Sequence, residues 1–321
     1  MSKKSTAERR QAASRPAAGG GGGNGRGPRA GSGGGGPARH SSRRSPRGGQ
    51  RRPWGIFASI GGVIAVFVAV IIFFDLTSGA AVQDTQVLPA PASVVAAITH
   101  VPQSTLDTVG GGAANYPPRA LTTATKLTAN GKPELLYIGA EYCPYCALER
   151  WSLIGALSKF GSFSNLKIIK SSLTDGAGPN IATFTFAHGV SYTSRYITFV
   201  AREIYSNVPD PSTATGYANF QSLNSQQSQL FTTLGQSGFP FVDFGGIAAQ
   251  VGTESSSPGP TGLSNYSWQQ VASFLSKPHS SQAQMILGGV NYDTAAICKM
   301  TGNKPGKVCG QTVIQQLEGG L

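Results

Sequence analysis

The chain has 321 residues, of which 40% are hydrophobic and 12% are charged, and it contains 43 glycines. This composition allows one ordered domain of ordinary size with tails, and it excludes a wholly disordered chain. The net charge of +12 comes from residues 1–53, which hold 13 Lys/Arg and one acid, because the charges of residues 54–321 sum to zero. The basic charge therefore belongs to the N-terminal tail and not to the part expected to fold.

Residues 1–53 have runs of glycine between scattered arginines and almost no apolar side chains, so we expect a disordered tail. Arginine and glycine in this pattern can bind RNA through phosphate contacts and, with aromatic side chains, through base stacking. No Phe, Tyr or Trp precedes Trp54, however. The sequence therefore favours a solvated cytoplasmic tail that interacts loosely with anionic lipid, and nucleic acid is not expected as a partner.

Residues 54–74 form a stretch of 21 residues without a charge, about as long as a hydrocarbon core is thick. They are predicted to form a single transmembrane helix. Two arginines precede the stretch and an aspartate follows it, so the positive-inside rule places the N-terminus in the cytoplasm and residues 75–321 outside the cell membrane. A cleaved signal peptide, with small residues at 78–81 as its cleavage site, is the alternative.

Residues 75–90 are predicted to be a spacer, and residues 91–321 an extracytoplasmic domain. The domain is expected to begin with two small helices at residues 93–99 and 102–109, the second starting at a proline. Asn130-Gly131 then predicts a tight turn.

The central segment of the domain, residues 134–151, is expected to be a buried strand followed by a helix. Residues 135–138 are an unbroken apolar run, typical of a strand covered on both faces. Apolar residues then recur at helical spacing until Gly161. Cys143 falls at the predicted helix start, with Pro144 as the first helical residue, where a missing N–H costs nothing.

This placement favours redox chemistry at the pair Cys143 and Cys146. Unpaired N–H groups and the positive end of the helix dipole stabilise a thiolate, so Cys143 is expected to be the exposed nucleophile. Cys146 lies one turn further on, faces inward, and is placed to attack the mixed disulfide that Cys143 forms. A buried structural cysteine pair and half of a zinc site are the alternatives.

The chain between the helix and residue 238 is expected to add about sixty residues to a minimal redox fold, over residues 175–238. A strand at residues 166–173 would neighbour the central strand, and residues 181–186 and 195–205 look like a strand pair. The insertion either shapes or covers a substrate groove or is structural padding. His188 precedes a glycine and is interpreted as a turn residue.

The C-terminal third is expected to be two strands followed by helices. The expected strands are residues 241–244 and 247–251. Helices are predicted at residues 224–234, 267–275, 281–287, 290–299 and 312–317.

The central strand and the Cys-Pro-Tyr-Cys segment resemble the active-site segment of the thioredoxin superfamily, in its glutaredoxin-like version. Phe239-Pro240, followed by an apolar strand, resembles the cis-proline segment of that superfamily. The resemblance implies that Cys143, Cys146 and Pro240 form the catalytic site. It also implies that the neighbouring residues Pro144, Tyr145 and Phe239 bind an extended substrate.

One residue departs from the thioredoxin pattern. Many thioredoxins have a buried acid six residues before the first cysteine, where this chain has Tyr137. Glu141 or water would then have to transfer the proton of Cys146.

The whole layout is similar to the membrane-anchored family known as domain of unknown function 929. The similarity lies in residues 91–98, in residues 137–146, and in the segments around Cys298 and Cys309, and it covers roughly residues 88–318. It implies an α/β protein with a thioredoxin-like mixed sheet flanked by helices. The sheet would carry an insertion before the cis-proline strand, and one transmembrane helix would precede it.

Four cysteines outside the membrane imply two disulfides or one four-thiolate metal site. Ten residues separate Cys298 from Cys309, a spacing that favours a structural disulfide over a zinc site. A second redox pair that relays electrons to Cys146 is the alternative. No metal and no cofactor are expected, and the absence of a histidine after Cys146 argues against haem attachment.

Three functions are compatible with these features. The favoured one is a membrane-tethered thiol-disulfide oxidoreductase, whose partners are protein thiols or disulfides outside the membrane and an unidentified redox partner. The others are a thioredoxin-like binding or assembly module without turnover, and a thiolate protein that handles copper or zinc.

Overall fold

The structure, a computed structural model, describes residues 81–122, 125–255 and 257–321. The predicted tail (1–53) and the predicted transmembrane helix (54–74) lie outside these residues. Within the described ranges, no helix combines the length and the apolar character needed to cross a membrane.

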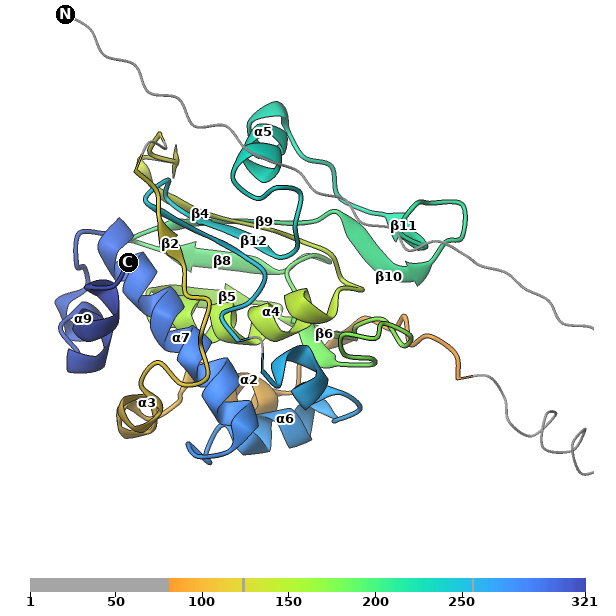
Figure 1. Ribbon diagram of the computed structural model, residues 1–321, viewed down its shortest axis with the longest axis horizontal. Helices are drawn as coiled ribbons and strands as arrows, with labels where there is room; N and C mark the ends of the chain where they lie inside the picture. Colours follow the sequence, from red (N-terminus) through yellow and green to blue (C-terminus); the bar gives the residue numbers. More distant parts are fainter. Residues whose placement is uncertain (1–80, 123–124, 256) are drawn as a thin grey trace, which may run out of the picture. The chain divides into compact units, whose positions relative to one another are not determined.

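A mixed sheet of six strands forms the centre of the domain (Figure 1). β4 (Lys132–Gly139) pairs in parallel with β9 (Thr198–Glu203) on one side and antiparallel with β12 (Phe241–Phe244) on the other. The other strands are β13 (Ala248–Val251), β2 (Arg119–Ala120) and β3 (Thr128–Ala129). The predicted turn joins β3 to β4, with Asn130 and Gly131 both at positive φ. A mixed sheet flanked by helices is thus confirmed.

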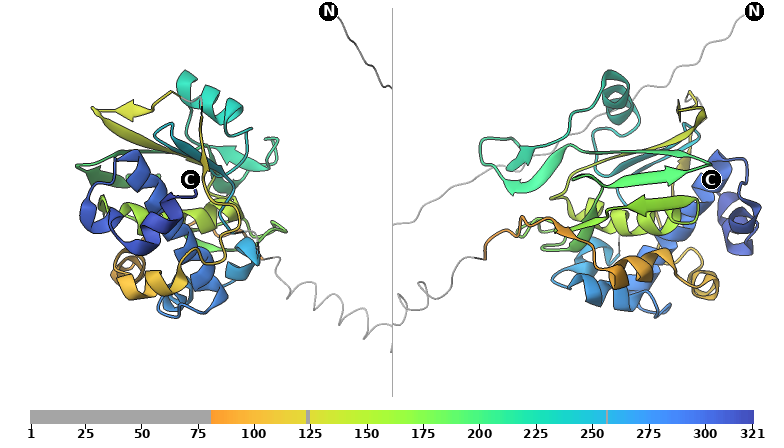
Figure 2. Two further views of the ribbon diagram at one scale, coloured as in Figure 1. Left: turned by 60° about the vertical axis from the view of Figure 1, so that its left-hand side comes forward. Right: turned by 180° about the vertical axis from the view of Figure 1, so that it is seen from behind.

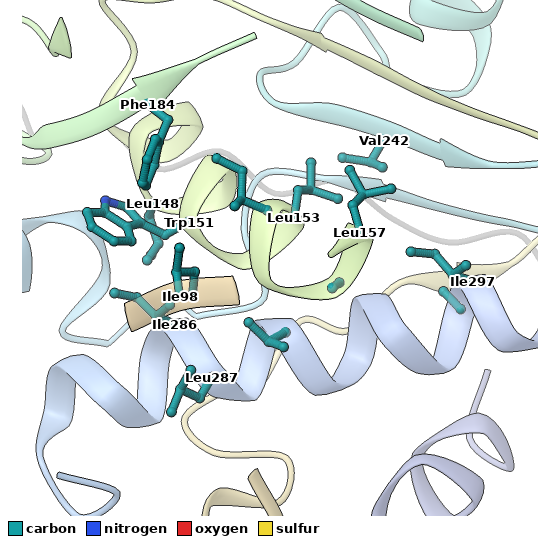
Figure 3. Close-up of a cluster of buried hydrophobic side chains, with 14 of the residues drawn as sticks. Ile98, Leu148, Trp151, Leu153, Leu157, Phe184, Val242, Ile286, Leu287 and Ile297 are labelled. Atoms are coloured by element: carbon teal, nitrogen blue, oxygen red, sulfur yellow. The ribbon is translucent and has the colours of Figure 1, made fainter. Parts of the chain in front are cut away.

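Helices cover both faces of this sheet. α4 (Pro144–Leu157) packs on one face together with α7 (Ser281–Met300), and α5 (Ser225–Thr233) places Phe231 against Leu136 and Ile138 on the other face. α4 lies between the sheet and α7, and Trp151 meets Phe184 edge to face (Figure 3). Because both of its sides are covered, α4 is buried along almost its whole length.

α7 corrects one prediction, since a single helix runs where two were expected. Gly288 and Gly289 lie between the two predicted helices, and both allow close packing. A Cβ on Gly288 would lie 2.7 Å from the carbonyl oxygen of Gly111, and a Cβ on Gly289 would lie 2.4 Å from Ser152 Oγ. The residues are small because neighbouring segments approach the helix there, not because the helix ends.

The strand predicted at residues 166–173 is present but has other neighbours than expected. β6 (Lys167–Lys170) pairs with β1 (Leu88–Pro89) and β7 (Ala182–Thr185) in a separate three-stranded sheet. The prediction that residues 181–186 and 195–205 pair with each other is therefore wrong, because β9 pairs with β4. Alternation along a strand identifies its two faces but not its partner.

The segment predicted as an insertion, residues 175–238, contributes to the core as well as to its margin. β9 belongs to the central sheet, whereas the hairpin of β10 (Tyr205–Pro209) and β11 (Tyr217–Asn219) forms a separate ribbon. This ribbon lies at the opposite end of the central sheet from α9 (Thr312–Glu318), as both views show (Figure 1, Figure 2). A second ribbon consists of β5 (Gly161–Ser164) and β8 (Ser191–Ser194).

Part of the predicted spacer lies against the domain. Gln83 donates to the carbonyl oxygen of Ser171 and accepts from the N–H of Leu173. Further short helices complete the described chain: α2 (Ala92–Thr99), α3 (Gln103–Val109), η1 (Gly259–Leu263), α6 (Trp268–Phe274) and α8 (Gly306–Cys309). Most of these match the predicted helices within one or two residues, whereas η1 and α8 were not predicted.

Candidate functional site

Cys143 is the N-cap residue of α4, as predicted. Its backbone is extended, Pro144 opens the helix, and the N–H of Cys146 donates to Cys143 Sγ at 3.4 Å. Both thiols are unbonded. Strand β4 ends at Gly139, so the dithiol lies just beyond the C-terminal end of this central strand, where α4 begins.

Both cysteines are more enclosed than expected. Cys143 is only 6% exposed and Cys146 is fully buried. Three aromatic side chains pack against them: Tyr142, Tyr205 of β10, and Phe239. The expectation that Cys143 is openly exposed is therefore wrong, because the hairpin and the segment before β12 cover it.

The two thiols have opposite pKa shifts. A hydrogen bond with the Cys146 side chain lowers the pKa of Cys143; burial opposes this effect, and the N–H of Cys146 and the charge of Arg150 reinforce it. Burial raises the pKa of Cys146 well above its ordinary value, and its hydrogen bond to Cys143 raises the pKa further. The pair therefore has one thiol disposed to ionise and one disposed to keep its proton.

A buried ion pair lies beneath the dithiol. Arg150 Nε donates to Glu203 Oε1 at 2.8 Å, and both side chains are fully buried. A second guanidinium nitrogen donates to Glu203 Oε2 at 2.9 Å and to the carbonyl oxygen of Ala140 at 2.6 Å. Although burial acts to lower it, the Glu203 carboxylate raises the pKa of Arg150, so the guanidinium stays charged. This positive charge favours the thiolate of Cys143.

Tyr137, six residues before Cys143, places a buried hydroxyl under the site. Tyr137 is fully buried, and burial raises the pKa of its hydroxyl well above 10. Its hydroxyl has no hydrogen-bond partner within the described residues.

Glu141, the residue considered for proton transfer, has two side-chain partners. Its Oε1 accepts from Thr185 Oγ1 at 2.7 Å and lies 3.0 Å from His188 Nε2. His188 is a turn residue as expected, at φ 55°, with Gly189 also at positive φ. The turn thus brings a histidine to a side chain two residues from Cys143, a contact that the sequence did not reveal.

The Phe239–Pro240 bond is cis, as predicted. Phe239 packs against the dithiol cluster, and the register of β12 places Phe241 opposite Ile138 at the end of β4. Pro240 therefore lies at the same end of the sheet as the cysteines. Of the two residues between the cysteines, Pro144 is buried and Tyr145 is 39% exposed.

Cys298 and Cys309 form the predicted disulfide. Cys298 lies in the last turns of α7, Cys309 ends α8, and both are buried. The disulfide joins residues that are 11 positions apart in the sequence.

Sequence reasoning missed Arg150, Glu203 and His188. Arg150 could have been noticed in the sequence, because it is a charged residue inside a helix whose other residues are largely apolar. Its partner Glu203 could not be found in this way, because it lies 53 residues away on β9, and the pairing of β9 with β4 has no local sequence pattern.

The described chain is thus a mixed α/β domain with an unbonded dithiol at the N-cap of a buried helix. Residues 120–299 match the family described as Domain of unknown function (DUF929), and the chain belongs to this family. The matched region contains the dithiol, Pro240 and Cys298 but ends before Cys309. No curated protein and no solved structure matches the chain.

Proposed function

We propose that this protein is a thiol-disulfide oxidoreductase that uses Cys143 as nucleophile and Cys146 as resolving thiol. The observation that carries the proposal is the N-cap position of Cys143, with its sulfur accepting the N–H of Cys146 and its pKa lowered. A thiolate is the attacking species in disulfide exchange, so this is the thiol that would start the reaction.

The reaction would proceed in two exchanges. The Cys143 thiolate attacks a partner disulfide, whose S–S bond breaks, and one partner thiolate leaves as a mixed disulfide forms. Cys146 then loses its proton and attacks Cys143 Sγ, which releases the second partner thiolate. The partner gains two electrons and the protein keeps a Cys143–Cys146 disulfide. The same steps in reverse oxidise a partner dithiol.

A thioredoxin-like fold is part of the proposal. It is supported by the order β4, α4, β9, α5, β12, β13, α7 around one mixed sheet, and by the cis-proline that precedes β12. On this interpretation Pro240 faces the dithiol, and Pro144, Tyr145 and Phe239 contact an extended substrate.

We further propose that residues 54–74 tether the domain to the outer side of the cell membrane. This rests on the uncharged stretch and the arginines before it. Protein thiols and disulfides outside the membrane would then be the substrates, and a separate redox partner would restore the dithiol.

The proposal is tested by assaying insulin reduction and peptide-thiol oxidation with the full-length protein. The wild type should turn over in at least one assay, and Cys143→Ser should abolish turnover in both. The double variant Cys298→Ala/Cys309→Ala, which removes the other cysteine pair, is the control and should keep activity per folded molecule. If the wild type turns over in neither assay, a binding module becomes the better account of the fold.

A further inference from the structure

A second cluster of buried charged side chains lies between α4 and α7. It consists of Glu149 of α4, Glu254 of the loop after β13, and Asp293 of α7. One carboxylate oxygen from each residue lies within 4.8 Å of the other two. None of the three side chains is more than 1% exposed. Residues distant in sequence therefore converge on one enclosed point.

These carboxylates have no counter-charge in the part of the chain that the structure describes. As carboxylates, Glu149 and Asp293 have no hydrogen-bond donor there for any of their four oxygens. Only when protonated could each share a hydrogen bond with Glu254. The basic residue next to Glu149, Arg150, is already engaged by Glu203. A buried ionised carboxylate needs a hydrogen bond, an opposite charge or a metal ion. The cluster is therefore neutralised either by a bound cation or by protons on the carboxyl groups.

α4 and α7 approach each other closely beside this cluster. A Cβ on Gly289 would lie 2.4 Å from Ser152 Oγ and 3.0 Å from Glu254 Oε2. Glycine inside a helix weakens the helix, so its use here is explained by the need for room beside these oxygens. Gly289 and Asp293 are four residues apart on α7, and Glu149 and Ser152 are three apart on α4, spacings that put each pair on one helix face.

Glu254 is held in place by contacts of its own. Its carbonyl oxygen accepts from the N–H groups of Asn115 and Tyr116 at 2.8 and 2.9 Å. In the orientation that satisfies its neighbours, the Gln250 amide accepts from the N–H of Glu254 at 2.8 Å and donates to Glu254 Oε1 at 3.3 Å. Outer contacts of this kind orient carboxylate ligands in metal sites.

We propose that Glu149, Glu254 and Asp293 bind one divalent cation that prefers oxygen ligands, of the class Ca²⁺, Mg²⁺ and Mn²⁺. Such ions take carboxylate oxygens at roughly 2.0–2.6 Å, so three oxygens within 4.8 Å of one another can contact a single ion. The ion joins α4, which carries the dithiol, to α7 and to the loop after β13. Its chemistry is separate from the proposed redox function, because hard cations do not prefer thiolates.

Shared protons are the competing way to neutralise the cluster, since burial raises the pKa of all three carboxyl groups. The two accounts differ in their response to added ions. A cation that binds only the folded protein raises its melting temperature, whereas a proton-sharing cluster does not respond.

The test uses the full-length protein, stripped with a chelator and then dialysed against millimolar CaCl₂, MgCl₂ or MnCl₂. At about a hundredfold excess over the dissociation constant, one of these salts should raise the melting temperature by roughly 5–10 °C. Elemental analysis should find one ion per chain. Glu149→Gln and Asp293→Asn should lose both the ion and the shift.

The matched control is Asp243→Asn, which changes a fully buried acid outside the cluster and should keep both responses. The double variant Cys143→Ser/Cys146→Ser should also keep them, which separates this site from the dithiol. If the wild type binds no ion and its melting temperature does not respond, the proposal is overturned. If Glu149→Gln fails to fold, Asp293→Asn and the stoichiometry of the wild type decide the matter.

Discussion

The two cysteine pairs of this chain occupy opposite ends of helices. Cys143 caps the N-terminus of α4, where the helix dipole and free N–H groups favour a thiolate. Cys298 lies in the last turns of α7 and Cys309 ends α8, where the dipole disfavours one. Under the proposed function, the same chemical group takes part in disulfide exchange in one case and in a structural disulfide in the other. Helix polarity separates the two roles more clearly than burial does, because all four cysteines are buried.

The largest expected effect is on trapping of partners. Cys146→Ser should accumulate mixed disulfides through Cys143, because the second exchange cannot take place. Non-reducing gels followed by mass spectrometry would detect them. Cys143→Ser is the control and should trap none. If Cys143→Ser traps partners and Cys146→Ser does not, the roles of the two thiols are reversed.

The next largest effect is expected on the free energy of unfolding, when the ion pair under the dithiol is broken. Arg150→Met leaves the buried Glu203 carboxylate without its opposite charge and should lower the free energy of unfolding by about 3–5 kcal/mol. Denaturant titration measures this loss.

The double variant Arg150→Met/Glu203→Leu is the matched control, and it should recover most of that stability. It should also shift the alkylation of Cys143 to higher pH, because the guanidinium no longer favours the thiolate. An unchanged alkylation profile would show that Arg150 has only a structural role.

Much of this site could be predicted from sequence because its signals are local. The apolar run of β4, the proline after Cys143 and the helical spacing of α4 all lie within one short segment. Two partners of that segment, Tyr205 and Glu203, could not be predicted, since they reach it through long-range strand pairing. Phe239 was expected there only from the resemblance of its segment to a known family. The continuity of α7 could not be predicted for a related reason. Gly288 and Gly289 leave room for Gly111 and Ser152, which are distant in the chain but pack against the helix there.

Loss of the second pair should affect stability and leave exchange intact. Cys298→Ala/Cys309→Ala opens a loop whose ends are 11 residues apart, which should lower the free energy of unfolding by about 3 kcal/mol in the chain-entropy model. Thermal or denaturant unfolding measures the change. The activity per folded molecule should match that of the wild type, and a loss of turnover in folded protein would favour the electron-relay interpretation.

The smallest effect concerns how the reduction potential of Cys143–Cys146 varies with pH. Below the lowered pKa of Cys143, reduction takes up two protons, and the potential should fall by about 59 mV per pH unit. Between that pKa and the raised pKa of Cys146, reduction takes up one proton, and the slope should halve to about 30 mV.

The sign follows from linkage. The lowered pKa of Cys143 stabilises the reduced, folded protein fully above the ordinary thiol pKa of 9.0, and this stabilisation is lost as the pH falls through the lowered value. A single slope up to pH 9 would contradict a lowered pKa for Cys143.

The most direct test of the contrast between the two pairs is an equilibrium titration of the full-length protein in graded glutathione buffers, with each cysteine followed by alkylation and mass spectrometry. Cys143 and Cys146 should change from disulfide to dithiol within the glutathione range, while Cys298–Cys309 should stay oxidised throughout. Reduction of both pairs together, or a disulfide linking Cys298 to Cys143, would contradict this expectation.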